Sequence, residues 1–165
     1  MRGSHGFTRH PMSDIHARFA GIDRLYGAGT LTRLAAARVT VVGIGGVGSW
    51  AVEALARSGV GHIRLVDADD LCLSNTNRQL PALDGQYGRL KVEAMAERLR
   101  AINPGISLEP VARFLTTDTM EPLLGEGGAP AGRQNRRGGG GQLDEITPRN
   151  HACLFRSRPP PGEQA

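Results

Sequence analysis

One part of the chain consists of two short apolar runs separated by a stretch with helical spacing. Arg38–Val42 is β-branched and nearly all apolar, which is typical of a buried parallel strand. Ser49–Ser58 follows with small and apolar side chains three and four positions apart, so it predicts a helix that Gly59 ends. His62–Val66 is predicted to be a second strand, which ends at Asp67. The three segments predict a βαβ unit with parallel strands and a right-handed crossover.

More helices and one more strand are predicted around this unit. Residues 13–27 begin with a Ser-Asp pair that can cap a helix, and Thr30–Arg38 forms a second, shorter helix. Apolar side chains recur at helical spacing over Gly88–Asn103, and Ile106–Val111 alternates as a third strand does. The predicted fold class is α/β, a Rossmann-like, mostly parallel sheet with N-terminal helices and an incomplete C-terminal half.

Composition divides the chain into three parts. Glycine and proline make up one third of residues 121–165, which have no periodic pattern and are expected to form an irregular tail. Residues 1–11 also lack a pattern and are expected to be a disordered leader, with Met12 as a more natural start. The folded domain is therefore expected to span residues 12–120.

Charge and cysteine content argue against several classes of protein. The net charge of +4 lies mostly at the ends, because residues 12–120 contribute only +1, so it does not indicate a basic nucleic-acid-binding patch. Cys72 and Cys153 match no metal-binding spacing and no disulfide scaffold, which favours a reducing, cytoplasmic setting. No apolar run reaches the roughly 18 residues that a membrane helix needs.

Four glycines in the pattern GxGGxG separate the first strand from its helix. Glycines let the backbone approach a phosphate, and the start of the helix offers free N–H groups. Asp67 directly follows the second strand, where dinucleotide-binding domains hold the ribose hydroxyls. These residues alone fit an NAD- or FAD-dependent oxidoreductase, or a nucleotide-binding protein without catalytic activity. The glycines are Gly43, Gly45, Gly46 and Gly48.

The residues that follow Asp67 favour a triphosphate over a dinucleotide. Ser74–Gln79 reads SNTNRQ and brings amides and an arginine into the loop, and Lys91 stands near the start of the long helix. A dinucleotide pocket does not require such a cluster. A triphosphate carries several negative charges and develops more when its α-phosphate is attacked, so amides, a forked arginine and a lysine suit it.

Several stretches together resemble one known family. The signature of the ubiquitin-activating-type (ThiF/MoeB/HesA) adenylyltransferases resembles three features of this sequence. They are GIGGVGS at residues 43–49, LVDADDLCLSNTNRQ at 65–79 and a lysine thirteen residues after Arg78. Three further stretches resemble the tRNA threonylcarbamoyladenosine dehydratase branch of that family, namely RFAGIDRLYG, NTNRQ and KVEAMAERLRAINP. This resemblance runs from about Arg18 to Ile106. It implies an enzyme that uses ATP to activate the carboxylate of threonylcarbamoyladenosine at position 37 of tRNA, which then cyclises with loss of water.

The resemblance also implies a role for each site residue. Asp67 would bind the ribose of ATP, and the phosphates would be surrounded by Asn75, Arg78 and Lys91. Arg24 resembles an arginine that dimers of the family lend to the neighbouring active site. The implied catalytic residues are Arg78, Lys91 and Arg24. The implied nucleotide-binding residues are Gly43, Gly45, Gly46, Gly48, Asp67 and Asn75.

Cofactors and partners follow from the same resemblance. The implied cofactors are ATP and Mg²⁺. The implied partners are tRNA as the substrate, a second copy in a homodimer, and sulfur-transfer or sulfur-acceptor proteins. A second enzymatic function stays open, namely activation of the C-terminus of a ubiquitin-like sulfur carrier in thiamine or molybdopterin synthesis, although the NTNRQ and INP spellings favour the tRNA branch.

The sequence departs from the family after about residue 120. Members continue the sheet to a DAxDS-type segment whose second aspartate holds the magnesium of Mg-ATP, and here the only candidate is Asp118, with no strand before it. Residues 138–144 (GGGGQLD) resemble a loop of the family but come much too early. The chain is therefore expected to be a truncated or frameshifted member with little or no activity.

Four further residues near these motifs have simpler expected roles. Asp69 and Asp70 are expected to be solvated loop residues, and Cys72 a small packed side chain. Trp50 lies off the apolar face of its helix and is expected to pack on a neighbouring segment or subunit.

Overall fold

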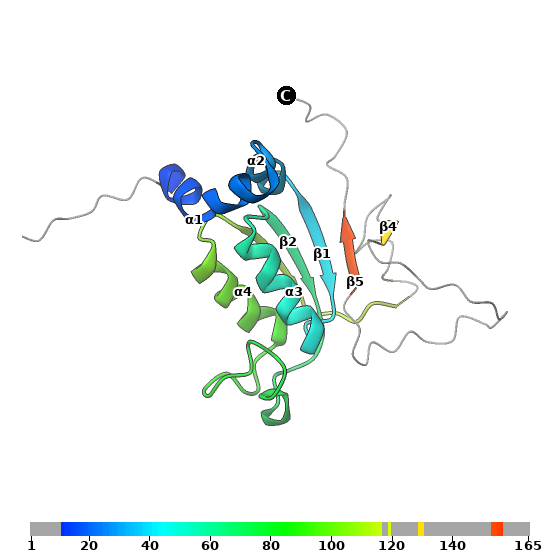
Figure 1. Cartoon of the computed structure of the whole chain (residues 1–165). Helices are drawn as coiled ribbons and strands as arrows, with labels where there is room; N and C mark the ends of the chain where they lie inside the picture. Colours follow the sequence, from blue (N-terminus) through cyan, green and yellow to red (C-terminus); the bar gives the residue numbers. More distant parts are fainter. Residues whose placement is uncertain (1–10, 117–118, 120–128, 131–152, 157–165) are drawn as a thin grey trace, which may run out of the picture.

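The computed structural model describes residues 11–116, 119, 129–130 and 153–156 of the chain. Its centre is a parallel sheet in which the first strand pairs with the second and the second with the third (Figure 1). These strands are β1 (Arg38–Val42), β2 (His62–Val66) and β3 (Ser107–Val111). Both strands of the predicted βαβ unit have the predicted bounds, so the α/β, Rossmann-like fold class is confirmed.

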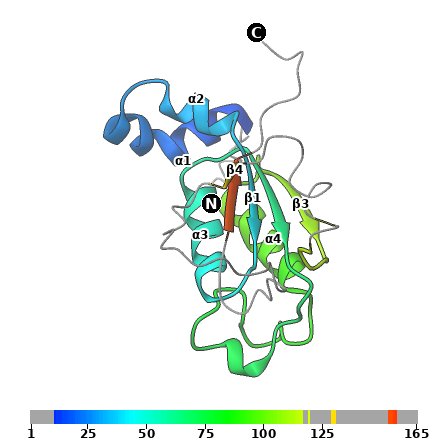
Figure 2. The ribbon, with the colours of Figure 1, turned by 90° about the vertical axis from the view of Figure 1, so that its right-hand side faces the viewer.

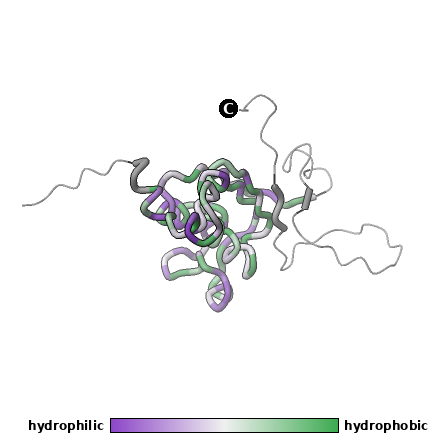
Figure 3. Tube along the Cα trace, turned by 45° about the horizontal axis from the view of Figure 1, so that its top comes forward, coloured by the Kyte–Doolittle hydropathy of each residue, from purple (hydrophilic) through white to green (hydrophobic). Residues whose placement is uncertain are grey.

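Helices α3 (Gly46–Arg57) and α4 (Lys91–Ile102) cover one face of this sheet (Figures 1 and 2). Hydrophobic and hydrophilic positions alternate along the trace, as expected of elements with one buried side (Figure 3). The core lies between the helices and the sheet. Its fully buried members include Val41, Ile63 and Leu65 from the strands and Val52, Met95 and Leu99 from the helices.

Helices α1 (Pro11–Tyr26) and α2 (Thr30–Ala35) lie beyond the end of the sheet at which β1 begins (Figure 1). Helix α2 ends three residues before the predicted Arg38. Arg38 already pairs with His62 in the sheet, so the chain has to leave the helix before it. No helix in the part of the chain that the structure describes is both long and apolar enough to cross a membrane.

Helix α4 begins at Lys91 rather than at the predicted Gly88. Gly88 has a φ of +83°, which is left-handed backbone that a helix does not contain, and its N–H donates to the carbonyl oxygen of Leu71 at 2.8 Å. The loop between β2 and α4 contains a short 3₁₀ turn, η1 (Leu73–Asn75), that the sequence pattern does not predict. Lys91 is thereby placed on the first turn of α4.

Two further strands, β4 (Ala129–Pro130) and β5 (Cys153–Arg156), complete the sheet in the order β3-β2-β1-β5-β4. Strand β5 runs antiparallel to β1. The sequence pattern assigns no regular element to residues 121–165, so these strands correct that expectation for the residues they contain. The remainder of the tail, including residues 138–144, and the leader up to residue 10 lie outside the described residues, as does Asp118.

Candidate functional site

The glycine motif forms the turn that leads from β1 into α3. Gly43 has a φ of +84°, and its N–H donates to the carbonyl oxygen of Val66 at 2.8 Å, so the turn starts at the end of both strands. The N–H of Ile44 donates to Asp67 Oδ2 at 2.6 Å. Asp67, at the end of β2, therefore holds the glycine turn against the sheet.

Helix α3 begins inside the motif, at Gly46, rather than at the predicted Ser49. Its first turn therefore consists of residues 46–48, whose N–H groups have no acceptor within the helix. A Cβ atom added to Gly45 would meet no other atom within 4 Å, so open space adjoins the turn. Free N–H groups and the positive end of the helix dipole make such a turn suited to an anion.

Lys91 is nearly buried, with 6% of its surface exposed, and it stands at the start of α4. The helix dipole disfavours a cation there, and an anionic partner offsets this effect. Asp69 is that partner, because its Oδ2 accepts from Lys91 Nζ at 2.7 Å and its carbonyl oxygen accepts from the Lys91 N–H at 3.0 Å. The N–H of Asp69 in turn donates to Asp67 Oδ1 at 2.9 Å. Asp69 is exposed in its loop, as expected, and it is in addition the ion-pair partner of Lys91.

Arg78 lies over the start of α3. A Cβ atom added to Gly46 would be 3.5 Å from Cγ of Arg78, so the arginine stem runs along the glycine turn. Its Nη1 donates to the carbonyl oxygen of Ser74 at 2.8 Å and to Asn77 Oδ1 at 3.0 Å. The side chain is exposed, so the guanidinium has donors to offer to a ligand at the turn.

The Asn75 side chain is buried and forms a hydrogen bond within its own loop. Its Oδ1 accepts from the N–H of Cys72 at 3.0 Å and so caps the turn η1. A role toward phosphate therefore falls to Nδ2, the donor end of the amide. Cys72 itself is exposed, contrary to the expectation of a packed side chain, because the neighbouring Leu71 is the residue that enters the interior.

Trp50 and Ser49 of α3 anchor this loop, although sequence reasoning did not assign either residue to the site. Trp50 Nε1 donates to the carbonyl oxygen of Arg78 at 3.1 Å, which is the contact with a neighbouring segment expected of this side chain. Ser49 is fully buried, and its Oγ accepts from the N–H of Leu80 at 3.3 Å. Their position directly after the last motif glycine is the one sequence signal that could have found them.

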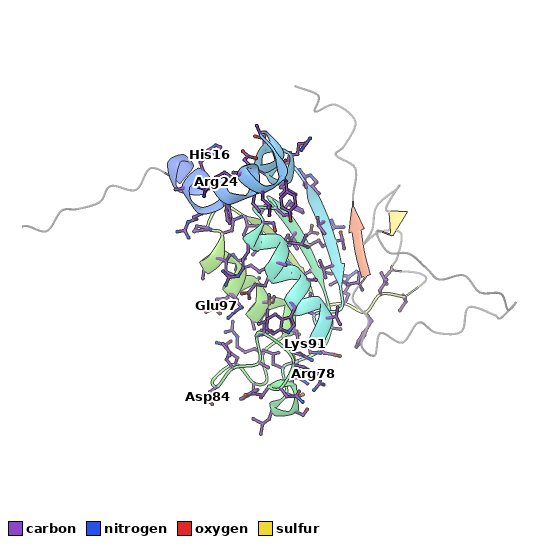
Figure 4. The ribbon with its side chains drawn as sticks, in the orientation of Figure 1. His16, Arg24, Arg78, Asp84, Lys91 and Glu97 are labelled. Atoms are coloured by element: carbon purple, nitrogen blue, oxygen red, sulfur yellow. The ribbon has the colours of Figure 1, made fainter. Side chains whose placement is uncertain are left out.

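The structure does not bring Arg24 to this site within one chain. Arg24 is exposed on α1, and Figure 4 shows it at the opposite end of the molecule from Arg78 and Lys91. Of the predicted site residues, the structure therefore gathers the glycines, Asp67, Asn75, Arg78 and Lys91 at one end of the sheet.

The site offers cationic and N–H donors, with no metal centre among its described residues. No group of three or more His, Cys, Asp or Glu side chains that could hold a metal occurs in the described part of the chain. The first turn of α3, Arg78 and Lys91 can together neutralise and orient an extended anion. Asp67 adds a carboxylate beside them, which suits the hydroxyl groups of a sugar.

Comparisons with known proteins agree with this geometry. The tRNA threonylcarbamoyladenosine dehydratase of Haemophilus influenzae is 50% identical over 116 residues, which are 70% of this chain and 44% of that protein. The molybdopterin-synthase adenylyltransferase of Salmonella typhimurium is 43% identical over 88 residues, 53% of this chain and 35% of that protein. The crystal structure of the Escherichia coli tRNA threonylcarbamoyladenosine dehydratase in complex with ATP matches with a TM-score of 0.62 and 54% identity, over 63% of this chain and 43% of that one.

The chain thus spans less than half of the length of these relatives. The model of the ThiF family matches residues 17–127, which are most of the chain and include every residue of the site just described. A chain with this match, this parallel sheet and this glycine turn is a member of the ThiF family.

Proposed function

We propose that this chain is the ATP-binding part of an enzyme that adenylates the carboxylate of threonylcarbamoyladenosine in tRNA. The observation that carries the proposal is the placement of two cationic side chains at one glycine turn. Arg78 lies along Gly46, and Lys91 is connected to the same turn through Asp69 and Asp67. A ribose-binding carboxylate alone would serve a dinucleotide, whereas the added cations serve a chain of phosphates.

The chemistry of this reaction assigns a task to each group. A carboxylate oxygen attacks the α-phosphorus of ATP, the bond from that phosphorus to the bridging oxygen breaks, and pyrophosphate leaves. Arg78 and Lys91 stabilise the negative charge that builds on the phosphate oxygens during this step. Ring closure within the modified nucleotide then displaces AMP, which carries away the former carboxylate oxygen, so that water is lost overall.

The remaining roles in the proposal concern groups that meet at the site. Asp67 binds the ribose, the first turn of α3 holds a phosphate, and Asn75 contributes Nδ2. Arg24 reaches the site of a second copy in a homodimer, because it lies too far from the site of its own chain (Figure 4). The described residues do not supply a set of carboxylates for the magnesium of Mg-ATP, so no step is assigned to that ion.

The relatives support the tRNA substrate over a sulfur carrier. Identity to the tRNA threonylcarbamoyladenosine dehydratase of Haemophilus influenzae is higher and extends over more residues than identity to the molybdopterin-synthase adenylyltransferase. The ATP complex of the Escherichia coli relative supports ATP as the nucleotide.

Ligand-dependent melting of the purified chain tests the nucleotide first, because a ligand that binds only the folded state raises the melting temperature. We expect ATP to raise the melting temperature and NADH to leave it unchanged. Protection by NADH without protection by ATP would contradict the proposal and favour an oxidoreductase.

The substrate is tested by exchange of labelled pyrophosphate into ATP. The acceptors to compare are tRNA that carries threonylcarbamoyladenosine, the same tRNA without the modification, and a ubiquitin-like sulfur carrier. Exchange that depends on the modified tRNA supports the proposal. Exchange that depends on the sulfur carrier would assign the chain to the other branch.

A further inference from the structure

Trp50 is a large aromatic side chain that the fold does not use for its core. It lies on α3 with 59% of its surface exposed, while the buried residues of that helix face the sheet. Its indole Nε1 nevertheless donates to the carbonyl oxygen of Arg78 at 3.1 Å, across 28 positions of sequence. This hydrogen bond fixes the indole N–H toward the loop that carries Arg78.

The hydrogen bond falls at a specific place on α3. Gly46 and Trp50 are four residues apart, so they stand one above the other on the same side of the helix. Arg78 lies across both of them, with its stem along Gly46 and its main-chain carbonyl held by Trp50. The arginine is therefore fixed at two points to the turn whose free N–H groups suit an anion.

The loop that carries Arg78 has few other attachments nearby. Ser49 accepts from the N–H of Leu80, and Thr76 Oγ1 lies 2.8 Å from the hydroxyl of Tyr87, which belongs to the same long loop. Of these contacts, the ones made by Ser49 and Trp50 join the loop to α3. The bond from Trp50 is the one that reaches Arg78 itself.

We propose that Trp50 is a positioning residue for Arg78, and that its indole N–H holds the guanidinium over the phosphate-binding end of α3. The proposal rests on the proposed function only in that phosphate is what Arg78 binds. The hydrogen bond from the Trp50 indole N–H to the carbonyl oxygen of Arg78, here called the tether, does not depend on a ligand. It is therefore tested on the chain alone as well as with ATP.

The first test uses no nucleotide. The sequence contains one tryptophan, so the indole N–H gives a single signal in a nitrogen-correlated NMR spectrum. We expect this proton to exchange slowly with water in the unsubstituted chain and in Arg78→Ala, because the acceptor is a main-chain oxygen. We expect Trp50→Phe to speed amide exchange in residues 73–80 about three- to tenfold while leaving β2 unchanged. An indole proton that exchanges freely, or an unchanged rate in residues 73–80, would overturn the proposal.

The second test asks whether the tether serves phosphate binding. Calorimetry with ATP is run on the unsubstituted chain, Trp50→Phe, Arg78→Ala and the double variant. We expect Trp50→Phe to weaken ATP binding about three- to tenfold when Arg78 is present and to have no further effect in Arg78→Ala. Additive losses would show that Trp50 acts independently of Arg78 and would overturn the positioning role.

Leu73 provides a matched control variant for Trp50. Leu73→Ala removes another exposed apolar side chain, 73% exposed, from the same loop, and should leave ATP affinity unchanged. Equal losses in Leu73→Ala would attribute the effect to loop composition and contradict the proposal. Absence of ATP binding in the unsubstituted chain would contradict the proposed function, while the exchange measurement would still decide the tether.

Discussion

Glu53 of α3 and Arg98 of α4 form a forked ion pair between the two helices that begin at the candidate site. Arg98 Nε donates to Glu53 Oε2 at 2.5 Å, and Nη2 donates to Oε1 at 3.2 Å. Arg57 also donates to Oε1 of the same carboxylate. Glu53 is seven residues after Gly46, and Arg98 is seven residues after Lys91, so the pair braces both helices two turns beyond their site ends.

This pair makes the free energy of unfolding depend on pH in the acidic range. The hydrogen bond from Arg98, followed by that from Arg57, lowers the pKa of Glu53 below its ordinary value of 4.5, against the opposing effect of burial. A carboxyl with a lowered pKa in the folded state stabilises the fold above the pKa of the unfolded state, and this contribution is lost as the pH falls through the folded pKa. We expect Glu53→Gln to lower the free energy of unfolding by about 1–2 kcal/mol at pH 7 and to flatten its decline below about pH 4.5 in urea titrations.

A control for the acid prediction is available on the same pair of helices. The side chain of Glu97 on α4 is 65% exposed, and its ion pair with Arg89 is at the surface. Glu97→Gln should change stability by less than about 0.5 kcal/mol. Equal losses in the two variants would show that the forked geometry at Glu53 adds nothing.

Substitutions at Gly45 and Gly61 are expected to have different effects, because Gly45 adjoins the binding site and Gly61 packs against another part of the fold. A Cβ atom on Gly45 meets nothing within 4 Å, whereas one on Gly61 would come within 1.8 Å of the Ala35 carbonyl oxygen. Gly45→Ala should therefore leave the melting temperature nearly unchanged but weaken ATP binding by about tenfold, which is about 1.4 kcal/mol. Gly61→Ala should lower the free energy of unfolding by about 3 kcal/mol. Unchanged ATP affinity in Gly45→Ala would remove the glycine turn from the binding site.

Lys91 and Asp69 should respond to substitution in opposite ways. Lys91→Met replaces a buried cation by an apolar side chain and leaves a half-exposed carboxylate, so stability should hold while pyrophosphate exchange loses about 2–4 kcal/mol of transition-state stabilisation. Asp69→Asn leaves the buried ammonium without its anionic partner and should cost about 1 kcal/mol of stability. Measured exchange at the unsubstituted rate in Lys91→Met would remove this residue from the mechanism.

Asp67 is expected to act mainly on ATP affinity. Its two carboxylate oxygens accept from the N–H groups of Ile44 and Asp69, so Asp67→Ala releases the glycine turn and also removes the proposed ribose ligand. Calorimetry should show a weaker affinity for ATP. Asp67→Asn keeps an acceptor at this position and should lose less affinity than Asp67→Ala. If the two variants bind ATP as the unsubstituted chain does, the carboxylate does not contact the ribose.

The strands and the general place of the site follow from local chemistry, and the ends of the helices do not. The β-branched run Arg38–Val42 predicts β1, and the alternation of apolar and polar residues over His62–Val66 predicts β2, both with the observed bounds. The low helix propensity of glycine favours a start of α3 at Ser49, whereas the helix begins at Gly46. The apolar spacing predicts Gly88 within a helix, whereas its backbone is left-handed.

The polar partners within the site were the harder part to predict. The sequence identifies Lys91 by its position after Arg78, but not the carboxylate that binds it, because Asp69 and Asp70 are equivalent in a linear pattern. The structure resolves this choice through the direction of the loop, in which Asp69 presents both its carbonyl and its carboxylate to Lys91. Strand β5 had no sequence signal, because its pairing with β1 depends on residues far away in the chain.

The pairing of β1 with β5 has a consequence for the order in which the chain assembles. Strands β1, β2 and β3, with the helices between them, come from one continuous stretch, residues 38–111. Strand β5 follows much later, so N-terminal segments emerge from the ribosome and pair first, and the edge contact with the longest separation forms last. Until Cys153–Arg156 arrives, the outer edge of β1 presents unpaired backbone groups to any other extended chain. The period between synthesis of the two strands is therefore when a newly made chain is most exposed to aggregation.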